Sequence, residues 1–321
     1  MPDVTTGRSE NELPALGICF EEYAYPHPVR FVPVQNDLQT LAMAYMDVQP
    51  GSEPNGKTVV LMHGKAFGGY YFEHVIEALT AAGYRVVVPD QIGWGKSSKP
   101  DIHYSFQLLA ANTAALLDHL GVGKVAVLGH STGGMTATRF TLMNPDRVTH
   151  LVLEDPLGLA DYRIGIPPQS EETLYEHEVH WTDPAVIRAY VAGYFVHPDP
   201  AVYEPLAEVL IRVTLSADYP RWARAAALTF QMIYQQPVRY EYDQIAPPTL
   251  LIVGAEDHVV PLGNYAQPDD LARLGDFIGL SEAAARDIPN ARRVVIPECG
   301  HIPHIEHPAK FLDAFLPFLA S

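Results

Sequence analysis

Short apolar runs alternate with amphipathic stretches along much of the chain. Runs rich in apolar residues occupy 57–62, 84–89, 125–129, 148–153, 249–254 and 293–297. Between them, segments such as 72–82 and 105–120 have helical spacing, and each precedes a glycine that suits a helix C-terminus. Continuous apolar runs predict strands that are buried on both faces. We therefore expect an α/β fold with a mostly parallel, doubly wound sheet.

The pattern changes between residues 157 and 246. Apolar β-branched runs disappear there, aromatic residues take their place, and several prolines interrupt the segment. This pattern predicts three to five short helices, inserted as a cap (157–246) into a core made of residues 1–156 and 247–321. A second excursion, at 263–281, predicts a surface loop or short helix whose role the sequence leaves open.

The N-terminal region predicts weaker elements. Residues 1 to about 16 are polar and are expected to form a loose arm, and segments near 18–23, 29–34 and 41–45 can form edge strands. The first 16 residues have no apolar segment typical of a secretory signal. We therefore expect a cytoplasmic protein, with secretion after removal of a signal as the alternative.

The stretch Gly129-His130-Ser131-Thr132-Gly133 lies between a predicted strand and a predicted helix. Glycines two positions to each side of the serine permit a sharp turn, because larger side chains would meet the strand and the helix. Such a turn holds the hydroxyl at a helix N-terminus, where N–H groups stabilise negative charge. Ser131 is therefore our candidate nucleophile, and an ordinary helix N-cap is the other interpretation.

A serine nucleophile needs a base, and the base needs an orienting acid. His301 follows the last predicted strand and precedes the last predicted helix, which makes it the candidate base. Asp257 lies just past the strand at 249–254 and is the candidate acid. Asp155 or Glu154, after the preceding strand, are the alternatives.

The chain order of serine, acid and histidine resembles that of the α/β-hydrolase family, over nearly the full length of the sequence. The resemblance implies an oxyanion hole formed by the backbone N–H groups of Thr132 and Lys65, the residue after His63-Gly64. It also implies a structural role for His63 and for the turn at 90–97.

The nucleophile narrows the function within this family. In this family the sharp turn that carries the nucleophile, here residues 129–133, is called the nucleophile elbow. Haloalkane dehalogenases and epoxide hydrolases carry aspartate at the elbow, so Ser131 argues against both. We interpret the chain as a serine hydrolase of the carboxylesterase type, which cleaves a small, largely apolar ester through an acyl-enzyme. Lactonases, amidases, carbon–carbon bond hydrolases and perhydrolases use the same triad, and some non-catalytic ligand-binding proteins share the fold, so these remain alternatives.

Aromatic residues of the predicted cap have two possible uses. They can form the internal core of the cap, or they can line an apolar pocket, and periodicity does not separate the two. Our candidates for the substrate pocket are Trp181, Tyr194 and Trp222, together with His130 beside the nucleophile.

The sequence gives little support for a metal or a cofactor. His301, His304 and His307 have a spacing that can hold zinc on one helix face, but prolines at 303 and 308 interrupt such a helix. Gly93-Trp94-Gly95 begins like the G-x-G-x-x-G motif of dinucleotide-binding loops but lacks the third glycine. We therefore expect neither a metal nor a cofactor.

The charge and composition of the chain exclude some classes of binding partner. The formal net charge of −17 argues against nucleic acid and anionic membranes as partners. No apolar run approaches the roughly 20 residues that a membrane-spanning helix needs. The two cysteines, Cys19 and Cys299, allow at most one disulfide. The expected partner is a small ester-like molecule, and the oligomeric state is left open.

Overall fold

The computed structural model describes residues 13–36, 38–51 and 53–321. Eight strands form one sheet in the order β1-β2-β4-β3-β5-β6-β7-β8. β1 (Val29–Asn36) and β2 (Gln39–Val48) pair antiparallel, and β2 is also antiparallel to β4 (Arg85–Pro89). All strand pairs from β4 to β8 are parallel. The fold class expected from the sequence is confirmed.

The parallel strands are apolar because helices cover both faces of the sheet. Their bounds are β3 (Thr58–Met62), β5 (Val125–His130), β6 (Val148–Glu154), β7 (Thr249–Gly254) and β8 (Ala291–Ile296). Along β3, Val59 and Leu61 enter one hydrophobic core, whereas Val60 and Met62 enter the other. Alternate residues thus supply two separate cores from one apolar run.

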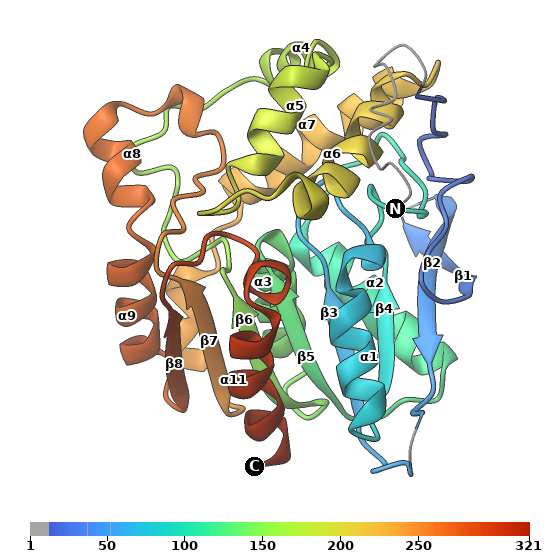
Figure 1. Ribbon diagram of the computed structural model, residues 1–321, viewed down its shortest axis with the longest axis vertical. Coiled ribbons are helices and arrows are strands. Elements are labelled where there is room, and N and C mark those ends of the chain that lie inside the picture. Colours follow the sequence, from blue (N-terminus) through green and yellow to red (C-terminus); the bar gives the residue numbers. More distant parts are fainter. Residues whose placement is uncertain (1–12, 37, 52) are drawn as a thin grey trace, which may run out of the picture.

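Two sets of helices form these layers, as Figure 1 shows. α1 (Glu73–Ala81), after the short 3₁₀ helix η2 (Gly69–Phe72), and α11 (Pro308–Ala320) cover one face. α2 (Phe106–His119), α3 (Thr132–Met143) and α9 (Phe277–Asp287) cover the other. Ser105 caps α2, because its hydroxyl accepts a hydrogen bond of 3.1 Å from the N–H of Leu108.

Residues 157–246, called the insertion from here on, lie between β6 and β7. They contain α4 (Glu171–Val179), α5 (Pro184–Ala192), α6 (Pro200–Thr214), α7 (Tyr219–Gln235) and the 3₁₀ helix η3 (Arg239–Gln244). α4 packs on α7 and α5 packs on α6. Figure 1 places these four α-helices above the carboxyl ends of the parallel strands. The division into a core and a separate cap domain stays a prediction.

The segment at 18–23 forms turns instead of the expected edge strand. Phe20 adopts a φ of 51°, and its N–H binds the carbonyl of Gly17. Leu16 and Phe20 are fully buried, and the N–H of Leu16 binds the carbonyl of Arg212 in α6. The apolar residues of this segment therefore anchor it between the core and the insertion. Of the arm expected at 1–16, residues 1–12 lie outside the described chain.

The second excursion is more helical than expected. It contains the 3₁₀ helix η4 (Gly263–Tyr265), α8 (Pro268–Leu274) and the start of α9, which continues to Asp287. Among the described residues, no helix combines the length and the apolar character that crossing a membrane requires.

Candidate active site

Ser131 lies at a strained turn between β5 and α3. Its φ of 55° and ψ of −122° are rare for a residue with a side chain. A Cβ at position 129 would overlap the carbonyl of Gly133, and a Cβ at position 133 would overlap the carbonyl of Met62. The carbonyl of Ser131 accepts hydrogen bonds from the N–H groups of Gly134 and Leu157. The strand, the helix and the loop after β6 thus hold this turn together.

Ser131, His301 and Asp257 form one hydrogen-bonded chain. The Ser131 hydroxyl lies 3.0 Å from Nε2 of His301, and Nδ1 of His301 lies 2.7 Å from the Asp257 carboxylate. The other Asp257 oxygen accepts from the N–H of Val259 at 2.9 Å. Since ionised Asp257 can only accept, Nδ1 carries the proton and Nε2 is free to accept the serine proton. The sequence placed these residues at the ends of three different strands, and the fold brings all three together.

Asp155, the alternative acid, is held away from the imidazole. Both of its carboxyl oxygens face the N–H of Gly254, at 3.0 and 3.2 Å. Burial, and next the negative charge of Asp257, hold the pKa of Asp155 well above its ordinary value. We infer that Asp155 is protonated. The neighbouring Glu154 binds His304 instead.

His63 makes hydrogen bonds that hold the backbone near the site. Nε2 of His63 accepts from the N–H of Gln91 at 2.9 Å, and Nδ1 lies 2.7 Å from the carbonyl of Gly64. Burial lowers the pKa of His63, so its ring is neutral at neutral pH. These contacts fit the structural role that the family resemblance implies for His63.

His130 supports the loop that carries His301. Its Nε2 lies 2.7 Å from the carbonyl of His301, and its Nδ1 lies 2.8 Å from the hydroxyl of Tyr71. Burial, and next His301, lower the pKa of His130 well below its ordinary value. The Tyr71 hydroxyl also accepts from the N–H of Gly64 at 2.8 Å. Sequence reasoning missed Tyr71, which lies just before the helix predicted at 72–82 and belongs to the 3₁₀ helix η2 in the structure.

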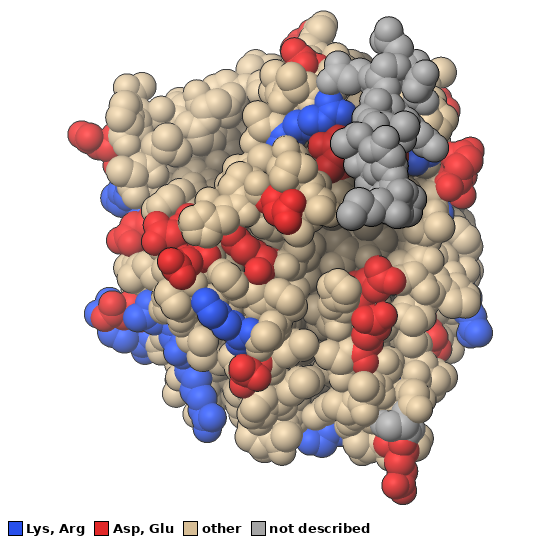
Figure 2. All heavy atoms as spheres, viewed as in Figure 1, with Lys and Arg blue, Asp and Glu red and all other residues tan. Residues whose placement is uncertain are grey.

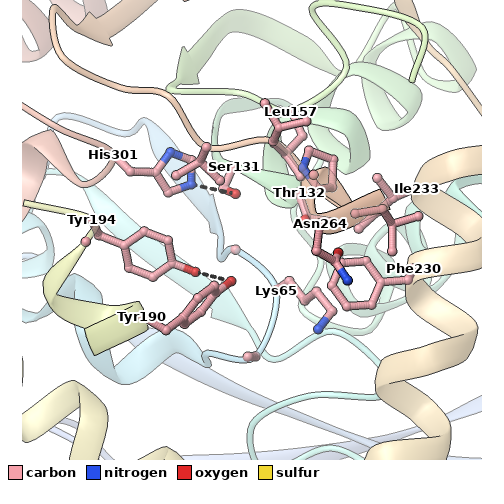
Figure 3. Close-up of a pocket in the computed structure, with 18 of the residues that line it drawn as sticks. Lys65, Ser131, Thr132, Leu157, Tyr190, Tyr194, Phe230, Ile233, Asn264 and His301 are labelled. Atoms are coloured by element: carbon pink, nitrogen blue, oxygen red, sulfur yellow. Dashed lines mark hydrogen bonds between the residues drawn. The ribbon is translucent and has the colours of Figure 1, made fainter. Parts of the chain in front are cut away.

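A pocket of about 560 Å³ opens beside Ser131. Figure 3 shows Tyr190 and Tyr194 on the side of His301, whereas Lys65, Phe230 and Asn264 lie on the opposite side. Figure 2 shows the face between the α5 and α8 regions hollowed and uncharged. Thr132 also lines the pocket as the first residue of α3, where N–H groups lack helical partners. The roles of the Thr132 and Lys65 N–H groups as oxyanion donors stay a prediction.

Three of the four predicted pocket residues line this pocket: His130, Trp181 and Tyr194. The prediction for Trp222 is wrong, since it is not among the lining residues. Its ring stacks on Tyr219 and meets the edge of Trp94, and only 1% of the residue is exposed. Trp222 therefore packs inside the insertion and against the core. Helical periodicity cannot distinguish its side of α7 from the pocket side, on which Phe230 and Ile233 lie.

One ion pair crosses the pocket from the core to the insertion. Nζ of Lys65 lies 3.5 Å from Oε2 of Glu178 in α4 and 3.8 Å from the centre of the Phe230 ring. Burial lowers the pKa of Lys65 against the opposing effect of Glu178. Burial raises the pKa of Glu178, but Lys65 and His177 together outweigh it and lower the pKa overall. The two side chains thus face each other within a largely apolar wall.

The three histidines with zinc-like spacing have separate partners. His301 binds Asp257 and Ser131, and Nδ1 of His304 lies 2.9 Å from buried Glu154. Nε2 of His307 lies 2.7 Å from the carbonyl of Glu298. Over residues 13–36, 38–51 and 53–321, no three metal-ligating side chains converge. Each histidine is thus accounted for by a protein hydrogen bond.

The family model for the alpha/beta hydrolase fold matches residues 57–308, which include the elbow and all three triad residues. The chain belongs to this family. A crystal structure of a probable hydrolytic enzyme from Pseudomonas aeruginosa PAO1 superimposes with a TM-score of 0.93 and 40% sequence identity. That match covers 98% of this chain and 100% of the other.

Two relatives share one name, 2-hydroxy-6-oxononadienedioate/2-hydroxy-6-oxononatrienedioate hydrolase. The protein from Paraburkholderia xenovorans (strain LB400) is 29% identical and covers 91% of this chain and 95% of its own length. Hydrolase 2 from Pseudomonas putida is 30% identical, with coverage of 90% and 96%. Hydrolases therefore match this α/β hydrolase over nearly its full length, and the chain is a hydrolase.

Proposed function

We propose that this hydrolase works through an acyl-enzyme on Ser131. The observation that carries the proposal is the hydrogen-bonded chain from Ser131 through His301 to Asp257. The Ser131 oxygen attacks a carbonyl carbon while His301 takes its proton, and Asp257 stabilises the resulting imidazolium. His301 then gives that proton to the leaving group. A water molecule, deprotonated by His301, releases the acyl group and restores Ser131.

The start of α3 supports the stabilisation of the oxyanion. Thr132 opens the helix directly after Ser131, and Lys65 lies opposite on the loop after β3. The N–H groups of these two residues are our proposed donors to the negative oxygen of the tetrahedral intermediate. Helix N-termini favour such negative charge, and a single donor of this kind typically accounts for about 10²–10³ in kcat.

For the scissile bond, we favour a carbon–carbon bond beside a ketone over an ester. Relatives with 29% and 30% identity over nine-tenths of the chain are named as hydrolases of 2-hydroxy-6-oxo dienedioates. In such a reaction the Ser131 oxygen bonds to the ketone carbon, the carbon–carbon bond breaks, and the leaving carbon takes a proton. This reaction was an alternative in our interpretation of the sequence, beside the carboxylesterase.

The Lys65 ammonium supports an acidic substrate. A lysine has three donors, and Glu178 accepts one of them at the long distance of 3.5 Å. We propose that a substrate carboxylate takes another of these donors, while Glu178 keeps its contact with His177. Apolar residues around the rest of the pocket, such as Phe67 and Leu157, suit an unsaturated carbon chain. The same apolar walls favour the second candidate function, hydrolysis of a small apolar ester.

A direct comparison of substrates tests the scissile bond. The purified protein is given a 2-hydroxy-6-oxo dienoate, whose conjugated absorbance is lost on cleavage, and a series of p-nitrophenyl esters. We expect kcat/KM for the dienoate to exceed that for the best ester by at least about tenfold, or 1.4 kcal/mol. An ester cleaved faster than the dienoate would assign the enzyme to the carboxylesterases.

The Lys65→Met variant tests the carboxylate contact, and it keeps the backbone N–H. A hydrogen bond to a charged group is worth about 1.5–3 kcal/mol, so the ratio of kcat/KM for the acid over its methyl ester should fall about 10–100-fold. Lys124→Met, at an exposed position, is the matched control. If the ratio is the same in both variants, the carboxylate binds elsewhere.

A further inference from the structure

The loop that carries His301 lies against the backbone of the insertion. The N–H of His301 donates to the carbonyl of Tyr194 at 2.7 Å. A Cβ at position 300 would overlap that same carbonyl, so Gly300 permits the approach. The turn after α5, at residues 193–197, therefore touches the backbone of the proposed base directly.

Glu306 spans this contact with a single carboxylate. One of its oxygens accepts from the N–H of Gly300 at 2.6 Å. The other accepts from the N–H of Val196 at 2.7 Å and from that of His197 at 3.4 Å. The first N–H belongs to the histidine loop and the other two belong to the insertion. Since hydrogen bonds to a carboxylate are stronger than neutral ones, this arrangement holds the two segments in one geometry.

The opposite side of the histidine loop is fixed by the loop that carries Asp257. The N–H of Glu256 donates to the carbonyl of Cys299 at 2.9 Å. A Cβ at position 254 would overlap the carbonyl of Gly300, so β7 also approaches closely. His301 is therefore held between the acid on one side and the insertion on the other. A shift of residues 194–197 has to be transmitted to His301 or break the bonds of Glu306.

The insertion side of this connection reaches the substrate pocket. The hydroxyl of Tyr194 donates to that of Tyr190 at 2.6 Å, and both residues line the pocket, as Figure 3 shows. The Tyr194 and His301 rings have centres 5.2 Å apart. A group bound against these tyrosines would therefore contact the turn to which Glu306 binds.

We propose that Glu306 is a positioning residue that couples the insertion to His301. The proposal rests on the role of His301 as the base. Glu306 touches no reacting atom; it fixes the backbone of residues 300 and 301 relative to the turn at 194–197. Displacement of this turn by a substrate therefore changes the alignment of the base with Ser131.

The Glu306→Gln variant tests the coupling, and Glu256→Gln is the matched control. Glutamine keeps one acceptor oxygen, but its NH₂ group cannot accept a hydrogen bond. One of the backbone N–H groups bound by the Glu306 carboxylate therefore loses its acceptor. Glu256 is exposed and lies beside Asp257, so its variant removes a charge nearby without breaking these bonds. In Glu306→Gln, but not in the control, we expect amide exchange at residues 196–197 and at 300–301 to accelerate together, by at least about tenfold.

Kinetics of the same variants separate positioning from general support. We expect kcat of Glu306→Gln to fall about 10–100-fold, with KM changed by less than about threefold, because the base is misaligned while the pocket is kept. Faster exchange in the insertion without faster exchange at 300–301 would overturn the coupling. An unchanged kcat despite faster exchange in both segments would overturn the positioning of His301.

The wild-type protein supplies a measurement that needs neither a variant nor turnover. If one carboxylate holds both segments, the amides of Val196 and Gly300 open in the same event. Their protection factors should then agree within about threefold. Protection factors that differ by more than about a hundredfold would contradict the proposal, whatever reaction the enzyme catalyses.

Discussion

Asp155 and Asp257 follow neighbouring strands, β6 and β7, and both carboxyl groups are buried. Their hydrogen bonds separate their roles. Asp257 faces the imidazole of His301, whereas Asp155 faces the N–H of Gly254. Burial, and next the negative charge of Asp257, hold the pKa of Asp155 well above its ordinary value. The proton therefore belongs to Asp155.

This difference predicts unequal effects of two matched substitutions. Asp257→Asn should lower kcat by about four orders of magnitude, because the amide favours the wrong histidine tautomer. Asp155→Asn should lower kcat by less than about tenfold, since asparagine resembles the neutral carboxyl already present. Steady-state turnover of one substrate by both variants checks this. A severe loss in Asp155→Asn with a mild one in Asp257→Asn would move the acid to β6.

The protonated Asp155 also predicts how stability depends on pH. Its pKa is raised in the folded protein, so the stabilising proton is fully bound below the ordinary value of 3.8 and is lost as pH rises through the folded pKa. Asp155→Asn has no such proton. The wild-type protein therefore loses this stabilisation as pH rises above 3.8, whereas the Asp155→Asn variant does not. The free energy of unfolding of the variant minus that of wild type should rise by up to about 1.4 kcal/mol per pH unit. Urea denaturation at several pH values measures this, and a constant difference would contradict a neutral Asp155.

At single positions, the three residues proposed as the triad could be picked out from the sequence, because each follows a strand that the pattern of apolar residues reveals, and they lie within hydrogen-bond distance of one another. Trp222 shows the limit of this reasoning. It shares α7 with the pocket residues Phe230 and Ile233, yet it packs against Trp94 and Tyr219. The spacing of apolar residues in α7 separates its buried side from its exposed side, but which of the buried residues face the pocket depends on tertiary packing.

The elbow is the element on which the site depends most. Gly133 allows α3 to start directly against β3, because a Cβ there would overlap the carbonyl of Met62. Gly133→Ala should therefore lower the free energy of unfolding by about 3 kcal/mol or more, with loss of turnover in the folded fraction. Gly123→Ala, where a Cβ meets nothing within 4 Å, should change it by less than about 0.5 kcal/mol. Equal denaturation midpoints for both variants would mean that the turn relaxes freely.

Elements with strong apolar patterns were predicted more successfully than the N-terminal segment. The parallel strands and the helices between them follow directly from uninterrupted apolar runs and helical spacing. Residues 18–23 have a similar apolar content, but Phe20 is buried in a core where its ring meets Tyr70, and the N–H of the preceding Leu16 binds the carbonyl of Arg212 in α6. Partners so far away in the chain leave no local signal in the sequence.

In the whole molecule, the insertion covers the edge of the sheet at which the triad residues meet. Trp181, Tyr190 and Tyr194 line the pocket from the insertion, whereas Ser131 and His301 line it from the core. We therefore expect the insertion to determine which substrates bind and the core to determine the chemistry.

The Trp181→Ala variant tests this division. Loss of a large apolar surface should lower kcat/KM for bulky acyl or aryl groups by about tenfold relative to small ones, at about 25 cal/mol per Å² of apolar area. The rate of labelling of Ser131 by a small phosphonate should stay within about threefold of wild type. Trp222→Phe, away from the pocket, is the control. An unchanged ranking of substrates in Trp181→Ala would show that Trp181 does not determine specificity.

Trapping of the covalent intermediate tests the central claim most directly. The wild-type enzyme is mixed with substrate, quenched in acid within one turnover and digested, and the acylated peptide is identified by mass spectrometry. We predict an acyl group on Ser131 alone, and neither adduct nor turnover in Ser131→Ala. Acylation at another residue, or a Ser131→Ala variant that turns over at more than about one hundredth of the wild-type rate, would contradict an acyl-enzyme mechanism at this elbow.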